Sequence, residues 1–386
     1  MKRLAIICTH PIQYLAPVFR LLAQERPIKV FYTWGNQEQS QYDPGFGREI
    51  YWDVPLLEGY DYQFVPNTSK QAGSHHFMGI VNPDLIEEIL HWSPSAVLVY
   101  GWSYYSHLQL MRRLKGQIPV WFRGDSHLLD EQPLWKRVIK RVVLRQVFSW
   151  VDLAFYVGTA NKWYFQAAGL KEPQLAFAPH AIDNKRFADD INKQYAHKAV
   201  QWRAQLGFMP EDKVLLYAGK LEPKKNPILL LKAVQQYNTR HTLQLKLLYV
   251  GNGVLETELK QLAKEDPNVH FLDFQNQSRM PIVYRLGDVF CLPSSGPGET
   301  WGLAINEALA SGIPVIVSDR VGCAIDLIHP EDTGYVFKHN DFNHFQEVLH
   351  VLIEEIKQGK LIGKPAKFIA NWSFEQQIEP LKRFLN

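Results

Sequence analysis

The chain has 386 residues, a length that suits two domains with separate hydrophobic cores. Its 42 Lys and Arg against 39 Asp and Glu leave a formal net charge of +3, which gives no reason to expect nucleic acid as a partner. The three cysteines, Cys8, Cys291 and Cys323, are scattered, so they favour a reducing cytoplasm and indicate neither a disulfide framework nor a zinc site. No stretch approaches the roughly 20 apolar residues of a membrane span, so we expect a cytoplasmic protein that is soluble or peripheral.

The first half of the chain alternates short apolar runs with helical stretches. The runs LAIICT, IKVFYTW, AVLVYGW, IPVWFRG, LAFYVG and QLAFAPH have the continuity of strands buried on both faces of a parallel sheet. PDLIEEILHW and YSHLQLMRRLKG have helical spacing and lie between them. This alternation predicts a doubly wound α/β domain over residues 1–190.

A basic helix is predicted later in this half, over EQPLWKRVIKRVVLRQVFSW. One stripe of it holds Lys136, Arg137, Lys140, Arg141 and Arg145, and another holds Trp135, Ile139, Val142 and Val143. Two interpretations stay open, namely a packing helix with a solvated basic face and a helix that contacts an anionic membrane through residues 134–148. The second would place the protein on the inner face of the plasma membrane and favour a lipid-linked acceptor.

The second half repeats the alternation after a polar boundary segment near residues 187–206. Its apolar runs are KVLLYAGK, QLKLLYVGNG, NVHFLDF, VFCLPSS, PVIVSD and GYVFK, and they predict a second doubly wound domain over residues 191–370. A closing helix is expected over residues 371–386. Ligands of such folds bind at the carboxyl ends of the strands, so two facing sheets would place a site in a central cleft.

The stretch SSGPGETWGLAINEALASGIPVIVSD carries two glutamates in an unusual setting. Glu299 lies in a Gly and Pro loop, and Glu307 lies in a helix that should end near Gly312. The N–H groups from Thr300 to Leu303 would form a helix start that binds phosphate. Glutamates beside such a site suit a sugar attached to phosphate, with one gripping the sugar and the other a ribose. The plainer alternatives are a capping carboxylate and an exposed helix residue.

A lysine cluster follows an earlier strand, in YAGKLEPKKNP. Lys220, Lys224 and Lys225 lie just past a strand end, where cations would neutralise a diphosphate and stabilise its charge as it leaves. A solvated surface cluster is the alternative.

These motifs resemble the signature of retaining glycosyltransferase family 4, in which Glu, an aromatic residue, Gly and Leu precede a second Glu. The matching residues are Glu299, Trp301, Gly302, Leu303, Glu307, Ala308, Gly312, Pro314 and Val315. Lys220 takes the position of a family arginine and Lys225 that of a family lysine. Replacement of arginine by Lys220 keeps the charge but loses a planar two-pronged donor.

The resemblance implies a GT-B architecture, in which two Rossmann-like domains face a central cleft. Residues 1–190 would bind the acceptor, residues 191–370 the donor, and the helix 371–386 would cross back to the first domain. The implied reaction is retaining transfer from a UDP- or GDP-sugar to a glycan or lipid-linked acceptor, as in bacterial surface polysaccharide or lipopolysaccharide synthesis. No metal or other cofactor is implied, because lysines and a helix start would hold the diphosphate.

The resemblance also assigns residues to roles. The catalytic residues would be Glu299, Lys225, Lys220, Asp125 and His127. Donor contacts would come from Glu307, Thr300, Trp301, Gly302, Leu303, Gly219, Gly251, Phe274, Gln275, Gln13 and His10. Candidates on the acceptor side are His75, His76, His180 and Arg123. For His10 a turn role stays open, and for His75 and His76 a surface role.

Two competing functions fit the same frame. A nucleotide-sugar 2-epimerase would consume donor without acceptor, and a non-catalytic binding protein would bind donor without forming product. A glycosidase is disfavoured because Glu299 and Glu307 share one phosphate-binding element instead of flanking a bond. A nicotinamide dehydrogenase is disfavoured because no G-x-G-x-x-G follows a predicted strand.

Overall fold

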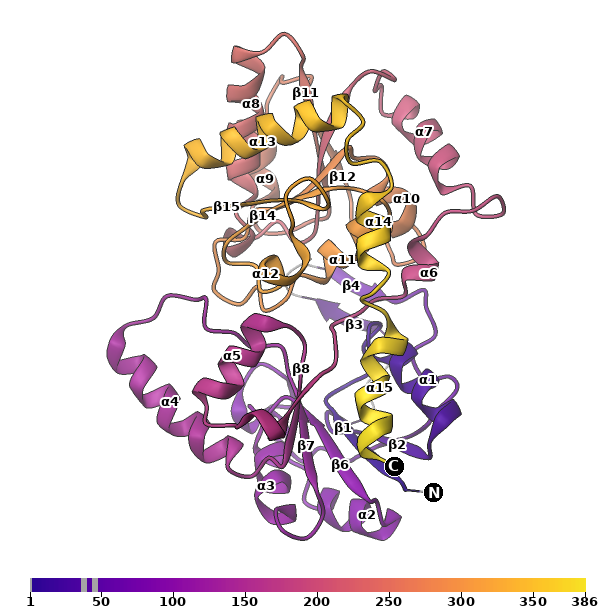
Figure 1. The fold of residues 1–386 in the computed structure, drawn as a ribbon, viewed down its shortest axis with the longest axis vertical. Helices are drawn as coiled ribbons and strands as arrows, with labels where there is room; N and C mark the ends of the chain where they lie inside the picture. The colour runs from indigo at the N-terminus through magenta and orange to yellow at the C-terminus, as the bar shows by residue number, and fades with distance from the viewer. Residues whose placement is uncertain (1, 36–39, 44–47) are drawn as a thin grey trace. The chain divides into compact units, whose positions relative to one another are not determined.

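The computed structural model describes residues 2–35, 40–43 and 48–386. The chain divides into two compact units, and each has its own parallel sheet with helices around it (Figure 1). The first unit comprises Met1–Ser40, Val54–Ala181 and Trp372–Asn386, and the second comprises Gln41–Asp53 and Ile182–Asn371. The chain therefore passes between the units at 40/41, 53/54, 181/182 and 371/372.

The sheet of the first unit is parallel, in the order β5-β2-β1-β6-β7-β8-β9. Its strands are β1 (Leu4–Cys8), β2 (Ile28–Tyr32), β5 (Asp61–Phe64), β6 (Ala96–Tyr100), β7 (Val120–Arg123), β8 (Leu153–Tyr156) and β9 (Leu175–Phe177). Successive residues of β1 alternate between two apolar clusters, with Leu4 and Ile6 in one and Ala5 and Ile7 in the other. Burial on both faces explains why these strands have continuous apolar runs.

Helices surround this sheet. They are α1 (Ala16–Glu25), α2 (Leu85–Trp92), α3 (Tyr105–Leu114), α4 (Leu134–Phe148), α5 (Thr159–Ala167) and α15 (Phe374–Phe384), with short turns η1 (Phe77–Gly79) and η2 (Glu172–Gln174). The last helix, α15, begins where the Ser373 side chain accepts a hydrogen bond from the Gln376 N–H. It packs beside α1, and its Ile378 and Leu381 join the same apolar cluster as Leu4 (Figure 1). The C-terminal helix therefore completes the core of the N-terminal unit.

The sheet of the second unit is also parallel, in the order β12-β11-β10-β13-β14-β15. Its strands are β10 (Lys213–Ala218), β11 (Leu245–Val250), β12 (Val269–Leu272), β13 (Val289–Leu292), β14 (Val315–Ser318) and β15 (Gly334–Phe337). Numbered from β10, this is the 3-2-1-4-5-6 order of a Rossmann fold. The order reverses between β10 and β13, and ligands bind outside the carboxyl ends of the strands at such a point.

Helices also surround the sheet of the second unit (Figure 1). They are α6 (Asn184–Phe187), α7 (Tyr195–Gln205), η3 (Pro223–Lys225), α8 (Pro227–Arg240), α9 (Glu256–Leu262), α10 (Met280–Tyr284), α11 (Leu303–Ala310), α12 (Ala324–Leu327), α13 (Phe342–Lys357) and α14 (Lys364–Ile369). Among the helices of the described residues, none has the length and apolarity needed to cross a bilayer.

The predicted α/β class with two Rossmann-like sheets is confirmed, and every apolar run named above contains a strand. The sequence analysis did not identify the hairpin of β3 (Ser40–Asp43) and β4 (Arg48–Tyr51), whose polar sequence has no apolar run. Residues 41–53 belong to the second unit, although they precede most of the first unit in the chain.

Candidate functional site

Two glycines meet at the carboxyl edge of the second sheet. Gly219 follows β10 with a φ of +155°, and Gly251 follows β11 with a φ of +128°. A Cβ on Gly251 would lie 2.2 Å from the carbonyl oxygen of Gly219, so no larger residue fits there. The close backbone approach leaves this edge of the sheet open to a ligand that contacts the main chain.

Lys225 and Glu299 form an ion pair at the same edge. Lys225 ends η3, Glu299 lies in the loop between β13 and α11, and the Lys225 Nζ contacts Oε2 of Glu299. The Ser294 hydroxyl donates to that oxygen at 2.7 Å. The Glu299 residue is only 9% exposed, so the lysine and the serine compensate a carboxylate that is largely removed from water. The structure thus brings together two predicted residues that are 74 positions apart, and it adds Ser294, which the sequence analysis missed.

The loops that hold this pair are tied together by main-chain contacts. The Ser295 N–H donates to the Lys224 carbonyl at 2.9 Å, which joins the lysine loop to the loop after β13. The Tyr217 hydroxyl donates to the Lys220 carbonyl at 2.6 Å and fixes the start of the lysine loop. Burial and the nearby Glu299 carboxylate raise the pKa of Tyr217, so this phenol stays a neutral donor.

Helix α11 begins at Leu303, two residues later than the sequence pattern suggests. Gly302 precedes it with a φ of +95°, and a Cβ there would lie 2.9 Å from Val321 Cγ1. Trp301 is buried, and its indole N–H donates to the Asn306 side chain at 2.9 Å. The N–H of Gly322 donates to the Glu299 carbonyl at 3.1 Å, so the loop 299–302 is held by the loop that follows β14. Thr300 lies in this loop.

Glu307 is buried on α11 and belongs to a polar network. Its Oε2 accepts from the Tyr284 hydroxyl at 2.7 Å, and its Oε1 lies 4.0 Å from Nη2 of Arg186. The same Arg186 nitrogen donates to Oε1 of Gln277 at 2.6 Å. The exposed-helix alternative for Glu307 is therefore wrong, because the residue is only 2% exposed. The sequence analysis missed Tyr284, Arg186 and Gln277.

The turn after β12 carries the predicted base contacts, Phe274 and Gln275. The Phe274 N–H donates to the Asn252 side chain at 2.9 Å, and the Gln275 side chain donates to the Asp273 carbonyl at 2.9 Å. Asn252 follows Gly251, so this turn is tied to the glycine loop. Phe274 and Gln275 thus lie at the same edge of the sheet as Gly219 and Gly251.

In the first unit, the loop after β1 holds His10 and Gln13. The His10 ring contacts the Thr9 hydroxyl at 2.9 Å and lies edge-on to Trp34 at 5.3 Å. Burial lowers the pKa of His10 to about 4, so the ring is neutral at pH 7. Gln13 is half-buried in the same loop. Both lie beyond the carboxyl end of β1.

Arg123, Asp125, His127 and His180 lie at or just beyond the carboxyl ends of β7 and β9. The Arg123 guanidinium is buried and donates to the carbonyls of Ala178 and Pro179 at 2.7 and 3.1 Å. Burial and the Arg123 charge lower the pKa of His180 to about 4, an effect that Asp125 opposes. His127 is 5% exposed, and its Nδ1 accepts from the Leu129 N–H at 3.1 Å. Arg123 therefore has a clear structural task in holding the chain at 178–179.

Both predicted histidines of the loop 65–79, His75 and His76, are exposed. The His76 ring contacts the Gln71 carbonyl at 2.9 Å. A buried histidine that the sequence analysis missed is His107, which contacts the Thr33 hydroxyl at 2.9 Å and the Gly101 carbonyl at 2.8 Å. Its apolar helical surroundings give no signal of this network in the sequence.

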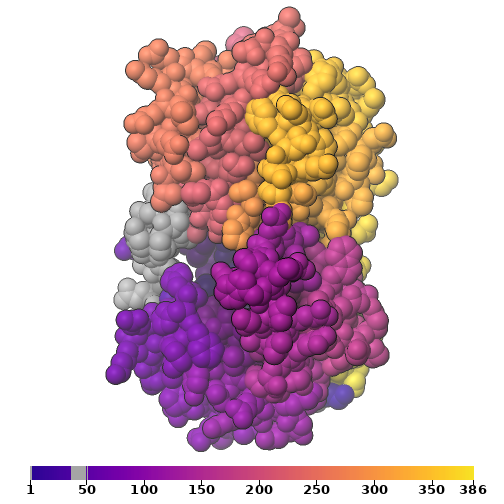
Figure 2. Space-filling model, turned by 90° about the vertical axis from the view of Figure 1, so that its left-hand side faces the viewer, coloured from indigo at the N-terminus to yellow at the C-terminus, as the bar shows by residue number. Residues whose placement is uncertain are grey.

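Helix α4 exposes apolar side chains together with its cations. Only Leu144, Val147 and Phe148 are buried, near the end of the helix. The exposed apolar residues are Leu134, Trp135, Val138, Ile139, Val142 and Val143, with exposed fractions from 45% to 75%. The segment faces the reader in Figure 2, where the colour runs to magenta. The interpretation that its apolar stripe packs inside the unit is therefore wrong.

Comparison with known proteins adds the family. Residues 199–367 match the model of the family described as glycosyl transferases group 1, and this range lies inside the second unit. The second unit is a group 1 glycosyltransferase domain. The predicted family is confirmed, and the domain contains Lys220, Lys225, Glu299 and Glu307.

Two curated relatives of this chain are 25–28% identical to it over the aligned residues. A mannosyltransferase of Corynebacterium glutamicum, named GDP-mannose-dependent monoacylated alpha-(1-6)-phosphatidylinositol monomannoside mannosyltransferase, is 28% identical over 253 residues, 64% of this chain and 65% of that relative. The sulfoquinovosyl transferase SQD2 of Arabidopsis thaliana is 25% identical over 298 residues, 72% of this chain and 52% of that relative. The chain thus spans less than two thirds of the length of these relatives.

A solved structure matches the fold over the whole chain. The Anabaena protein HepE in complex with UDP has a TM-score of 0.73 with 16% identity, over 100% of this chain and 99% of HepE. At this identity the match supports the fold alone. The predicted GT-B architecture, with two Rossmann-like units, is confirmed.

Proposed function

We propose that the protein is a retaining glycosyltransferase that moves a sugar from a UDP- or GDP-sugar to a glycan or lipid-linked acceptor. The observation that carries this proposal is the cluster of Lys225, Glu299 and Ser294 beside the glycine-started helix α11. It lies at the carboxyl edge of a sheet with Rossmann order, where such folds bind nucleotides. The family of the second unit supports the same reaction class.

The proposed chemistry needs charge stabilisation more than a general base. The acceptor hydroxyl oxygen forms a bond to the anomeric carbon while the bond from that carbon to the β-phosphate oxygen breaks. The departing phosphate oxygen takes the acceptor proton, and nucleotide diphosphate leaves. Lys225, Lys220 and the amides at Thr300 to Leu303 would stabilise its negative charge, which is the task of an oxyanion-binding site. These cations and amides would make a metal ion unnecessary.

In this proposal the two glutamates hold hydroxyl groups. Glu299 would accept from the transferred sugar, while its pairing with Lys225 fixes the direction of the carboxylate. Glu307 would accept from the ribose, and Phe274 and Gln275 would contact the base. Residues at the carboxyl edge of the first sheet, among them Asp125 and His127, would bind the acceptor side.

Names of similar proteins support the classes of donor and acceptor. The Corynebacterium relative is named as GDP-mannose-dependent and acts on a phosphatidylinositol mannoside, while HepE binds UDP. Solved structures of similar fold include WaaG, a glycosyltransferase involved in lipopolysaccharide biosynthesis. We therefore propose surface glycans or glycolipids as acceptors and leave the base as uridine or guanine.

We further propose that α4 brings the enzyme to an anionic membrane from the cytoplasmic side. Residues 134–148 contain five Lys and Arg and no Asp or Glu. Exposed apolar side chains such as Trp135 and Ile139 lie between these cations. Apolar residues can enter the lipid boundary while the cations contact anionic headgroups, each contributing about 1 kcal/mol near the surface.

Nucleotide binding and turnover test the enzymatic proposal. Thermal-shift measurements with UDP-, GDP-, ADP- and CMP-sugars identify the donor, and nucleotide diphosphate release is then measured with and without lipid and glycan acceptors. We expect release to depend on acceptor. Epimer formation without acceptor would instead indicate the epimerase, and binding without product in any acceptor would indicate a binding protein.

Vesicle co-sedimentation tests the membrane proposal. The double variant Arg141→Glu/Arg145→Glu should bind vesicles with 30% phosphatidylglycerol roughly 30-fold or more weakly, since two attractive charges become repulsive. The matched control is Arg112→Glu/Arg113→Glu, which reverses two exposed cations at the end of α3 in the same unit. Equal binding by all three proteins would refute the membrane proposal.

A further inference from the structure

The segment 48–53 holds the turn 276–278, which follows β12, through hydrogen bonds. The Asp53 carboxylate accepts hydrogen bonds from both the N–H and the hydroxyl of Ser278. Two residues earlier, the carbonyl of Tyr51 accepts from the Asn276 side chain. These contacts join residues 225 positions apart in the chain. The turn 276–278 is therefore held from outside its own part of the sequence.

The turn 276–278 is the first part of a series of polar contacts that ends at Glu307. Gln277, between the two gripped residues, is 7% exposed, and its Oε1 accepts from Nη2 of Arg186 at 2.6 Å. That nitrogen lies 4.0 Å from Oε1 of Glu307. A shift of the turn would move the Gln277 oxygen, and the guanidinium beside Glu307 would follow it.

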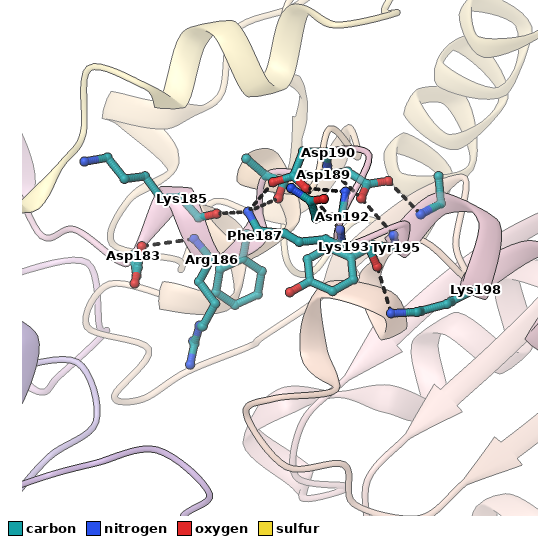
Figure 3. A network of polar contacts seen from close by, with 12 residues as sticks. Asp183, Lys185, Arg186, Phe187, Asp189, Asp190, Asn192, Lys193, Tyr195 and Lys198 are labelled. Carbon is teal, nitrogen blue, oxygen red and sulfur yellow. Dashed lines mark hydrogen bonds and ion pairs between the residues drawn. The ribbon is translucent and has the colours of Figure 1, made fainter.

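The main chain of Arg186 is fixed, so it cannot easily shift together with the turn 276–278. The Asp183 side chain accepts from the Arg186 N–H at 3.0 Å at the start of α6. The Lys193 ammonium donates to the carbonyls of Lys185 and Ala188 at 2.6 and 2.8 Å. Figure 3 shows the Arg186 side chain extending away from this network. Only the side chain is left to respond to the turn.

We propose that Asp53 is a positioning residue of the donor site. By holding Ser278, Asp53 fixes the turn 276–278. Through Gln277 it thereby fixes the position of the charged Arg186 guanidinium beside Glu307. The inference rests on the proposed function, in which Glu307 accepts from the nucleotide ribose. Asp53 contributes to ribose recognition without touching the nucleotide.

Four variants of the full-length protein test this series of contacts. Asp53→Ala removes both hydrogen bonds from Ser278, whereas Ser278→Ala removes only the one from the hydroxyl, and the double variant changes both partners. Glu49→Ala is the matched control, because this exposed carboxylate lies in β4 and accepts from the Tyr51 hydroxyl at 3.3 Å. Calorimetry with UDP and GDP selects the nucleotide that the wild type binds. The dissociation constants of that nucleotide and its 2′-deoxy and 3′-deoxy forms are then measured for every variant.

We expect Asp53→Ala to bind the ribonucleotide about 3- to 10-fold more weakly, a size typical of residues that act through others. Ser278→Ala keeps the main-chain N–H that donates to Asp53, so its loss should be smaller. The double variant should be no weaker than Asp53→Ala, because Ser278 then has no carboxylate to contact. The preference for the ribose form over whichever deoxy form the wild type discriminates should fall by the same factor, and Glu49→Ala should match the wild type.

Three results would overturn the inference in different ways. Wild-type affinity and ribose preference in Asp53→Ala, with nucleotide bound normally, would refute the role of Asp53 alone. A uniform loss for ribose and deoxyribose forms would refute it too, since a merely structural role of the hairpin predicts that pattern. Failure of the wild type to bind any nucleotide would remove the proposed function itself, and the inference with it.

Discussion

Replacing Lys225 by methionine is the most direct test of the donor site. Methionine keeps the length and apolar stem of the side chain but removes the charge that contacts Glu299. In the proposed reaction this charge also stabilises the departing diphosphate. Loss of one such donor typically reduces turnover about 100- to 1000-fold, or about 2.7–4 kcal/mol in the barrier.

Lys225→Met should also lower the free energy of unfolding, by an amount that depends on how completely the ion pair is buried. Removing one member of a fully buried ion pair costs about 3–5 kcal/mol. Here 21% of the Lys225 side chain is exposed and the Ser294 hydroxyl still donates to Glu299, so we expect about 1–3 kcal/mol. The double variant Lys225→Met/Glu299→Gln should recover stability, because no charge is left unpaired, but it should not recover turnover.

Initial rates of nucleotide diphosphate release, at saturating donor and acceptor, measure the effect. The matched control is Lys224→Met, because the neighbouring lysine is 46% exposed and pairs with Glu222 at 3.3 Å. We expect the control to keep turnover within about 3-fold of the wild type, as surface pairs contribute little. A Lys225→Met enzyme that turns over within 10-fold of the wild type would refute the assignment.

Three further predictions concern stability, pH and metal. Gly302→Ala should lower the free energy of unfolding by about 1–3 kcal/mol, since φ is +95° and the new Cβ would lie 2.9 Å from Val321, whereas Gly312→Ala, with nothing within 4 Å, should cost about 1 kcal/mol in urea denaturation. Burial lowers the pKa of His107 from 6.5 to about 4, so the unfolded chain binds this proton first as pH falls; His107 should therefore contribute up to about 3 kcal/mol to the loss of stability between pH 6.5 and 4. His107→Gln should reduce that loss but not abolish it, because His10 and His180 titrate in the same way. Dialysis against EDTA should leave transfer rates unchanged, and restoration of lost activity by Mg²⁺ or Mn²⁺ would contradict the metal-independent proposal.

Most strands of both sheets could be predicted because they are buried on both faces, whereas β5, whose residues are exposed or half-buried, was not identified. Continuous apolar runs such as LAIICT have few other interpretations in an α/β chain. The loop position of Glu299 and the helix after it also follow from local signals, since Pro and Gly exclude helix before Gly302. Such signals depend only on neighbours in the chain.

Contacts between distant segments could not be predicted. Arg186 and Glu307 are more than a hundred positions apart, and nothing in either segment indicates that they meet. Arg123 has the position of a ligand-binding residue at a strand end, yet its guanidinium holds two main-chain carbonyls. For α4 the sequence allowed both a packed and an exposed apolar stripe, because the helical pattern is the same in the two cases.

The passage of the chain from one unit to the other and back limits how this protein can be recombined. A chimera made by one cut near residue 182 would take its second unit without Tyr51 and Asp53, which hold the turn 276–278. Ser278 and Asn276 would then face a foreign loop or water. Under the proposed function, donor specificity would have to be grafted between relatives together with this short segment from the N-terminal part of the gene.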